Sequence, residues 1–385
     1  MDYRGLPSLP GMERNGQVYY NRERDLVEAL LPNGPFASCH APDLLELADG
    51  SLLCCWFAGT REGNADISIV LSRLDKGSTR WSEPIIVSDD MTRSEQNPSL
   101  FQANEQELWV MYTAQQARIQ ELPAHTNLQY TAEIRRRVSR DGGKRFDDTK
   151  TMFADPGSFC RQKIQKLSGG RWLFSTWHCF DDDTHNGSDI SCVWRSDDAG
   201  KSWQKTIVPD SQGCVHGHLV ERPDGTVLAF FRSRGADHIY RSVSRDGGVS
   251  FSSPEPTELP NNNAGISVVG LRSGAIAVAY NGCRFGDDRA VARWPRQRAP
   301  IVLAISEDEG HTFPYRRVLE LSDGYCGAWN GASNRRCEYP VLMQGRDGRL
   351  HVAYAWDNRN NIRYAGMTED WIRGQNKEEG LRYDF

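Results

Sequence analysis

The chain has 385 residues, of which 38% are hydrophobic, 25% charged and 10% aromatic, and its formal net charge at pH 7 is −5. This composition describes a globular protein with a buried core and excludes a chain that is mainly disordered. The negative net charge offers no general attraction to nucleic acid or to anionic membranes, so we expect neither as a partner. Any site for an anion must therefore be local.

The sequence shows no sign of a membrane segment. No stretch approaches the roughly 18 consecutive apolar residues that a membrane helix needs. Residues 1–15 lack the charged and then apolar profile of a signal peptide. We therefore expect that the chain either stays inside the cell or has lost a leader, and its localisation is left open.

Ten cysteines are scattered along the chain without a C-x-x-C pair and without the spacing of a zinc site. Buried free thiols are the prediction, although an oxidising compartment would allow one or two disulfides. We expect no metal and no cofactor.

The elements follow one another in a repeated order. Residues 18–31 are predicted to supply an outer strand that closes the last unit of the repeat. Each later unit begins with a hairpin that has a turn and an apolar run, at residues 45–53, 100–112, 164–177, 219–231, 268–280 and 341–356. Short alternating runs, typical of strands, follow these hairpins at residues 66–71, 190–194 and 301–305.

A turn motif, S-x-D-x-G-x-x-[FW], ends the third strand of most units. It occurs at residues 139–146, 196–203, 244–251 and 306–313, with a looser copy at 72–81 and a decayed copy that ends at Trp371. The aspartate can accept backbone N–H bonds, the glycine takes a positive φ, and the aromatic residue covers the next strand. We assign this Asp box to structure and not to catalysis.

Six units of roughly 50 to 70 residues, each able to supply four strands, predict an all-β fold, a six-bladed β-propeller. We expect a single propeller domain over residues 1–385, and a monomer. A seven-bladed propeller, with a blade built from the two termini, is the alternative. Through its Asp boxes and blade pattern the chain resembles the sialidase-like, or BNR-repeat, superfamily along nearly its whole length, and activity must be argued from the site.

The repeat also predicts where the site lies. The starts of the innermost strands and the loops after the second strands share one face of a propeller, and the Asp boxes lie on the other. The inner-strand starts carry polar or titratable residues where ordinary buried strands would have Val or Ile. This face is predicted to receive six cationic residues, Arg61, Arg161, Lys163, Arg232, Arg234 and Arg284. Because guanidinium groups bind carboxylates bidentately, the expected partner is an acidic oligosaccharide or the acidic end of a polysaccharide side chain.

The resemblance to sialidases is incomplete at the residues that carry their chemistry. Sialidases of this superfamily use three arginines on the sugar carboxylate, a tyrosine nucleophile activated by a glutamate, and an aspartic acid. Tyr339 stands where the resemblance places the nucleophile. The position of its glutamate partner falls in Tyr-Ala-Trp at 354–356, and the Arg-Ile-Pro-type triplet is replaced by His-Ala-Pro at 40–42. One arginine is thus a histidine, and the base for the tyrosine is missing.

These departures favour β-elimination from a uronate, in which a cation neutralises the carboxylate and His and Tyr move the protons. The chain resembles the lyases that remove terminal L-rhamnose from glucuronate in gum arabic, through its Cys-His-Ala-Pro opening at 39–42 and its face rich in Arg and His. That resemblance implies a polysaccharide lyase on rhamnosyl-α-1,4-glucuronate ends. An exo-sialidase or related glycoside hydrolase and a non-catalytic propeller that binds acidic glycans are the alternatives.

The expected site residues fall into two groups. Catalysis is assigned to His40, His216, Tyr339 and Arg161. Substrate binding is assigned to Arg61, Asn97, Lys163, His218, Arg232, Arg234, Asn281 and Trp356. An imidazole, with a pKa near 6.5, is a better base at neutral pH than a phenol, with a pKa near 10, but which residue is base and which is acid is left open.

Overall fold

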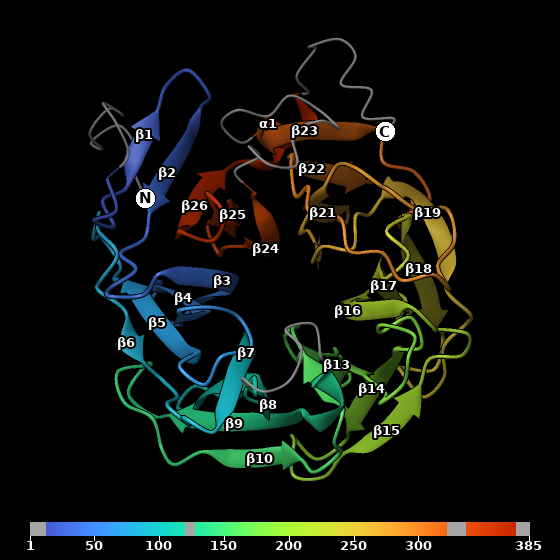
Figure 1. Ribbon diagram of the computed structural model, residues 1–385. Coiled ribbons are helices and arrows are strands. Elements are labelled where there is room, and N and C mark those ends of the chain that lie inside the picture. Colours follow the sequence, from blue (N-terminus) through green and yellow to red (C-terminus); the bar gives the residue numbers. More distant parts are fainter. Residues whose placement is uncertain (1–12, 120–127, 322–335, 375–385) are drawn as a thin grey trace.

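The computed structural model describes residues 13–119, 128–321 and 336–374. These residues form six antiparallel sheets set around a common axis, with β3, β7, β16 and β24 nearest the axis (Figure 1). The prediction of an all-β, six-bladed β-propeller is confirmed. A seventh sheet is absent from the described parts of the chain.

Each sheet is one blade, and in the first five blades the strands run outwards from the axis in chain order. The first two blades contain β3 (Ser38–Glu46), β4 (Leu52–Gly59), β5 (Ser68–Leu74) and β6 (Ile85–Ile86), then β7 (Arg93–Gln102), β8 (Leu108–Gln116), β9 (Glu133–Ser139) and β10 (Lys150–Phe153). The third and fourth contain β11 (Ser158–Cys160), β12 (Gln165–Lys166), β13 (Trp172–His178), β14 (Ile190–Ser196) and β15 (Gln204–Ile207), then β16 (Cys214–Glu221), β17 (Val227–Ser233), β18 (His238–Ser244) and β19 (Glu255–Pro260). The fifth contains β20 (Ser267–Gly270), β21 (Ile276–Asn281), β22 (Ile301–Ser306) and β23 (Tyr315–Glu320).

The sixth blade joins the two ends of the chain. Its strands β24 (Glu338–Gln344), β25 (Leu350–Trp356) and β26 (Asn361–Met367) are extended by β2 (Leu26–Leu30), which pairs with β26, and by β1 (Tyr19–Asn21), which pairs with β2. A buried salt bridge of 2.5 Å joins Arg363 on β26 to Glu28 on β2. The N-terminal strands therefore cover the edge that β26 would otherwise expose.

The regular Asp boxes form one type of hydrogen-bonded turn. In the box at 244–251, Ser244 Oγ accepts from Gly248 N and donates to Asp246 Oδ1, both at 2.8 Å. Asp246 Oδ1 also accepts from Val249 N at 3.0 Å and Ser250 N at 2.9 Å. Burial raises the pKa of Asp246, but the bonds from Ser250 and Ser244 outweigh it and lower the pKa to about 2. The carboxylate of Asp246 therefore serves as the hydrogen-bond acceptor that holds this turn together.

The decayed sixth copy of the box does not form this turn. Thr368 instead caps the short helix α1 (Glu369–Arg373), where its Oγ1 accepts from Trp371 N at 3.1 Å. Trp371 is buried against the fifth and sixth blades. The prediction of a sixth box was wrong because a capping threonine and a buried tryptophan imitate its spacing.

A second short helix, η2 (Gln129–Thr131), precedes β9.

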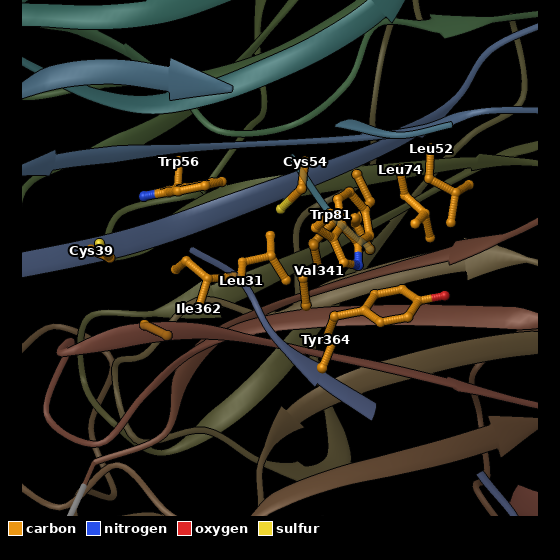
Figure 2. Packing of buried hydrophobic residues seen from close by; sticks show 14 of the residues in the cluster. Leu31, Cys39, Leu52, Cys54, Trp56, Leu74, Trp81, Val341, Ile362 and Tyr364 are labelled. Atoms are coloured by element: carbon orange, nitrogen blue, oxygen red, sulfur yellow. The ribbon is translucent and has the colours of Figure 1, made fainter. Parts of the chain in front are cut away.

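The hydrophobic core is divided among the contacts between blades. Six clusters of buried side chains each join two neighbouring blades. Figure 2 shows the cluster between the first and sixth blades, where Trp81 and Val341 pack with Leu31 from the N-terminal segment. Since the blades cover one another on both faces, polar residues buried near the axis need a separate explanation.

The nine cysteines within the described ranges are buried free thiols. Cys326 lies outside the described residues. Among the described residues, no helix combines the length and apolar character needed to cross a membrane.

Candidate active site

A repeated distortion of the innermost strands positions the central residues. The strand register shifts by a bulge after His40 in β3, Gln96 in β7, Val215 in β16 and Glu338 in β24. One residue at this level in each of five blades has a left-handed φ of 51–56°, namely Ala41, Asn97, His216, Asn263 and Tyr339. Such backbone is costly for a residue other than glycine, and bulges redirect side chains beside active sites.

Tyr339 lies between two histidines from other blades. Its ring centroid is 4.2 Å from that of His40 and 5.5 Å from that of His216. His216 also stacks on Trp177, with 4.4 Å between the centroids. The tyrosine is 9% exposed and each histidine 1%. The bulges of the first, fourth and sixth blades thus bring together three of the four residues that the sequence assigns to catalysis.

Arg232, from the end of β17, is the cation at the centre of this cluster. Its Nε donates to Asn263 Oδ1 at 2.7 Å, and its Nη1 donates to the Tyr339 hydroxyl and to His216 Nε2, the latter at 3.1 Å. These bonds use both hydrogens of Nη1. Nη2 is buried and has no partner within the described parts of the chain. Arg232 therefore keeps two donors for a ligand.

The protonation of the histidines follows from their surroundings. A guanidinium only donates, so His216 Nε2 must accept and its proton must lie on Nδ1. Burial, reinforced by Arg232, holds the pKa of His216 well below its usual value. Burial, reinforced by Arg359, does the same to the pKa of His40, whose two ring nitrogens have no partner in the described structure. Both imidazoles are neutral at pH 7.

The pKa of Tyr339 shifts in the opposite direction to that of an ordinary buried phenol. Burial raises its pKa, but Arg232 and Arg298 outweigh this and place the pKa of Tyr339 below 10. Burial, together with Arg234 and Arg298, lowers the pKa of the Arg232 guanidinium to about 10. A hydroxyl that gives up its proton more readily than usual thus lies beside two neutral imidazoles.

Arg161, the fourth residue assigned to catalysis, reaches this cluster but is used by the backbone. Its Nη1 donates to Pro42 O at 3.0 Å and Ala41 O at 3.3 Å, and its Nη2 donates to Tyr339 O at 3.2 Å. Its Cζ lies 5.3 Å from the centroid of the Tyr339 ring. The structure therefore places Arg161 as a tie between the first and sixth blades that adds positive charge near Tyr339.

Lys163 and His218 do not join Tyr339. They line a different cavity of about 250 Å³. Lys163 Nζ forms a salt bridge of 2.6 Å with Asp43. His218 Nε2 lies 2.7 Å from Ile266 O, and His218 Nδ1 accepts from Val268 N at 3.1 Å. Both side chains are therefore engaged by the protein itself.

Three other predicted binding residues also have internal partners. Arg234 forms a buried salt bridge of 2.5 Å with Asp189. Asn281 Nδ2 donates to Cys337 O at 2.9 Å and to Pro300 O at 3.2 Å. Trp356 packs against the cluster between the fifth and sixth blades, with Arg363 Cζ 5.7 Å from its ring centroid.

The remaining predicted cations and amide lie around this centre. Asn97 occupies the bulge of the second blade, where its carbonyl accepts from Cys160 Sγ at 3.9 Å. Arg61 is exposed and lines a cavity at the rim. Arg284 lies 2.9 Å from His238 Nε2 at the surface. The six cations of the sequence prediction are thus spread over the face. At its centre, Arg232 keeps both hydrogens of Nη2 for a ligand, whereas on Arg161 only Nε has no partner in the described structure.

Sequence reasoning missed the pair formed by Arg298 and Glu338. Glu338 is fully buried and accepts from Arg298 Nη1 and Arg359 Nε, both at 2.6 Å. Burial raises the pKa of Glu338, but Arg359 and Arg298 outweigh it and hold the pKa well below its usual range. Arg298 belongs to residues 282–300 between β21 and β22, a connection far longer than an ordinary hairpin loop, and that length was the available signal.

The same connection places an indole over the central guanidinium groups. Asn263 Nδ2 donates to Arg293 O at 2.6 Å, and Arg293 N donates to Arg234 O at 2.8 Å. The ring of Trp294 then lies 5.0 Å from Arg234 Cζ and 5.9 Å from Arg232 Cζ. Trp294 is 46% exposed, so this aromatic surface is open to a ligand.

Within the described ranges, no group of three or more His, Cys, Asp or Glu side chains is arranged to hold a metal ion.

Fold and site together define a β-propeller with a buried basic centre. The chain belongs to the BNR repeat-like domain family, whose model matches residues 50–352. None of the curated proteins matches the chain.

Solved structures share the fold. The Hadza microbial sialidase Hz136 superposes with a TM-score of 0.69 at 15% identity, over 89% of this chain and 68% of its own. A protein of unknown function from Dyadobacter fermentans DSM 18053 gives 0.70 at 17% identity, over 89% and 97%. The intramolecular trans-sialidase from Ruminococcus gnavus, solved with oseltamivir carboxylate, gives 0.65 at 14% identity, over 88% and 97%. At these identities the likeness establishes the fold alone.

Proposed function

We propose that this protein is an enzyme acting on a terminal acidic sugar, and that it is a polysaccharide lyase that releases L-rhamnose from rhamnosyl-α-1,4-glucuronate ends. The observation that carries the proposal is Nη2 of Arg232, which is buried without a partner in the described structure, beside Tyr339, His40 and His216. A buried charge without a counter-ion is costly. A sugar carboxylate bound there would supply the counter-ion through charge-assisted hydrogen bonds.

We assign the two proton transfers of the reaction to His40 and Tyr339, using the directions in which their pKa values are shifted. With its carboxylate neutralised by Arg232, the glucuronate holds a more acidic proton on C5. His40, which is neutral and has free ring nitrogens, accepts this proton. The C4–O bond breaks as the C4=C5 double bond forms, and Tyr339 donates its hydroxyl proton to the rhamnose oxygen that leaves. Return of the proton from His40 to the Tyr339 phenolate restores the enzyme.

Burial makes His40 a weaker base than a free imidazole, whereas Arg232 and Arg298 make Tyr339 a stronger acid than a free phenol. The assignment of base and acid therefore depends mainly on the tyrosine. His216, whose Nε2 is held by Arg232, orients the guanidinium. The indole of Trp294 would cover a sugar bound on Arg232, since it already lies over that guanidinium.

An exo-sialidase is the second candidate, and one observation favours it. The same bond from Arg232 to the Tyr339 hydroxyl would also stabilise a phenolate nucleophile. However, the Tyr339 hydroxyl has no carboxylate partner in the described structure, and Glu338 is engaged by Arg298 and Arg359. A carboxylate base for the tyrosine is therefore missing from the described centre, where the groups beside Tyr339 are the neutral imidazoles of His40 and His216.

Incubation with two substrates, gum arabic and a fluorogenic sialoside, separates the two candidates. On gum arabic, a lyase yields free rhamnose together with ultraviolet absorbance from the unsaturated uronate, and the remaining glycan is one water lighter than after hydrolysis. Rhamnose without that absorbance would contradict elimination. Release of sialic acid from a fluorogenic sialoside would support the second candidate instead. Binding of acidic glycans without any product would leave only a binding propeller.

A further inference from the structure

We propose that the rim of the propeller carries a second anion site, which binds a second acidic sugar residue of the same glycan; this inference rests on the proposed function. The site is a cavity of about 450 Å³ formed where β3 begins and where the loops after β4 and β25 meet. Its lining includes four arginines and one acidic residue, namely Arg61, Arg118, Arg336, Arg359 and Glu62. An excess of guanidinium groups in a protein of net charge −5 points to an anionic ligand.

The carboxylates near this cavity do not balance the arginines. Arg359 is paired with Glu62 and with Glu338, and Glu338 is already shared with Arg298. Arg336 comes no closer than 4.0 Å to Glu338. Arg61 is exposed and makes no side-chain hydrogen bond or ion pair in the described structure. Arg61 and Arg336 therefore have donors to offer to a ligand.

The cavity is built by an unusual backbone. Three successive residues after β25, Asp357, Asn358 and Arg359, have left-handed φ values of 52°, 58° and 72°, a conformation that residues other than glycine rarely adopt. Asn358 N donates to Arg336 O at 3.1 Å, and Arg336 N donates to Asn358 Oδ1 at 3.2 Å. This turn fixes Arg336 and Arg359 on the same cavity, as a preformed binding site requires.

The rim cavity adjoins the central site through one side chain. Glu338 directly precedes Tyr339, accepts from Arg359 on the rim side and accepts from Arg298 on the side of the Tyr339 ring. One buried carboxylate thus lies between the two basic regions. Neighbouring residues of a single glycan can therefore occupy both, with one carboxylate on Arg232 and the next acidic group on Arg61 and Arg336.

Two inert probes test this site by titration calorimetry. Methyl glucuronide carries one carboxylate, and a disaccharide of two glucuronates joined through O3 carries two; neither has a substituent on O4 that could be eliminated. We expect Arg61→Ala and Arg336→Ala each to weaken binding of the disaccharide about tenfold and to leave binding of the monosaccharide unchanged. Arg245→Ala, at an exposed position in an Asp box on the opposite face, is the matched control.

The outcomes separate this inference from the proposed function. If Arg232→Ala weakens both probes while Arg61→Ala and Arg336→Ala weaken neither, the rim site is wrong and the central site stands. If Arg232→Ala weakens neither probe, the proposed function loses its carboxylate receptor. Because exposed charges are screened by salt, the gain of the disaccharide over the monosaccharide should shrink as salt is raised; a gain that does not respond to salt would also overturn the rim site.

Discussion

Nη1 of Arg232 on the fourth blade donates to the hydroxyl of Tyr339 on the sixth blade, so that the cation proposed to bind the substrate also tunes the acid proposed to act on it. This bond joins residues from distant parts of the chain, and it exists because bulged inner strands turn single side chains towards the propeller axis.

Replacement of Arg232 by lysine tests this double role. Arg232→Lys keeps a positive charge but removes the fork that serves Asn263, His216, Tyr339 and a ligand at once. We expect kcat/KM to fall by about 10²–10³, the usual effect of losing one preorganised donor. Arg245→Lys on the opposite face should leave kcat/KM unchanged. A variant that melts like the parent and turns over at the parental rate would contradict the assignment.

The pH dependence of the reaction distinguishes an acid from a nucleophile at Tyr339. A lyase needs the tyrosine protonated, so kcat/KM should fall as pH rises through its lowered pKa, at a pH below 10. A phenolate nucleophile would give the opposite slope. On the acid side, His40 stays neutral well below pH 6.5, so activity should persist there.

Removal of the Tyr339 hydroxyl also tests whether Tyr339 is the acid. Tyr339→Phe should lower kcat by about 10²–10⁴, the usual contribution of a general acid, with a much smaller effect on KM. Tyr20→Phe, which removes the hydroxyl of a half-buried tyrosine that donates to Asp25 in the N-terminal segment, is the matched control. Parental kcat in Tyr339→Phe would assign the proton transfer to another group.

Acid should destabilise the fold through its buried histidines. Burial lowers the pKa of His218 to about 3 and the pKa of His351 to about 4, whereas the unfolded chain binds their protons near pH 6.5. Between these values the unfolded state holds more protons. The free energy of unfolding should therefore fall as pH drops below 6.5, by up to about 1.4 kcal/mol per pH unit for each histidine.

Urea unfolding at several pH values measures this slope. His351→Gln should make it shallower, and His311→Gln, in an exposed Asp-box turn, is the matched control. An unfolding free energy that stays level between pH 6.5 and pH 4 would show that these histidines are not held neutral.

The blades could be predicted because each one repeats the same local sequence pattern. The Asp boxes and hairpin turns specify strand ends by short-range hydrogen bonds, which sequence patterns record directly. The polar starts of the inner strands were also predictable, since residues such as His40 and Tyr339 stand where buried strands prefer Val or Ile. Neither observation says which partner a side chain meets from another blade.

That missing information explains why some site residues did not meet. Lys163 and Arg234 carry the right charge on the right strand ends, but Asp43 and Asp189 from other parts of the chain pair with them. Arg298 is the opposite case. It lies outside the repeats, in the long connection between β21 and β22, and this connection brings its side chain next to the ring of Tyr339. Long-range pairing and irregular loops leave no periodic trace in a sequence.

Trp294 offers a test of how the terminal sugar is held. Its exposed indole lies over Arg234 and Arg232, in position to stack on a sugar whose carboxylate is bound below. We expect Trp294→Ala to raise KM about tenfold with little change in kcat, because stacking contributes to binding alike in the ground state and the transition state. Trp294→Phe should recover most of the affinity, and an unchanged KM in Trp294→Ala would exclude the stacking role.

The Asp boxes should affect stability and not catalysis. Asp246→Ala removes the acceptor for Val249 N and Ser250 N in a turn on the face opposite the candidate site. Loss of these bonds should cost about 1–3 kcal/mol of unfolding free energy. Since the turn lies at the far end of β18 from the bulged inner strands, kcat and KM for the acidic sugar should stay at parental values below the melting temperature. A variant that melts normally but loses activity would mean that this aspartate takes part in the reaction, and would move the candidate site to the other face of the propeller.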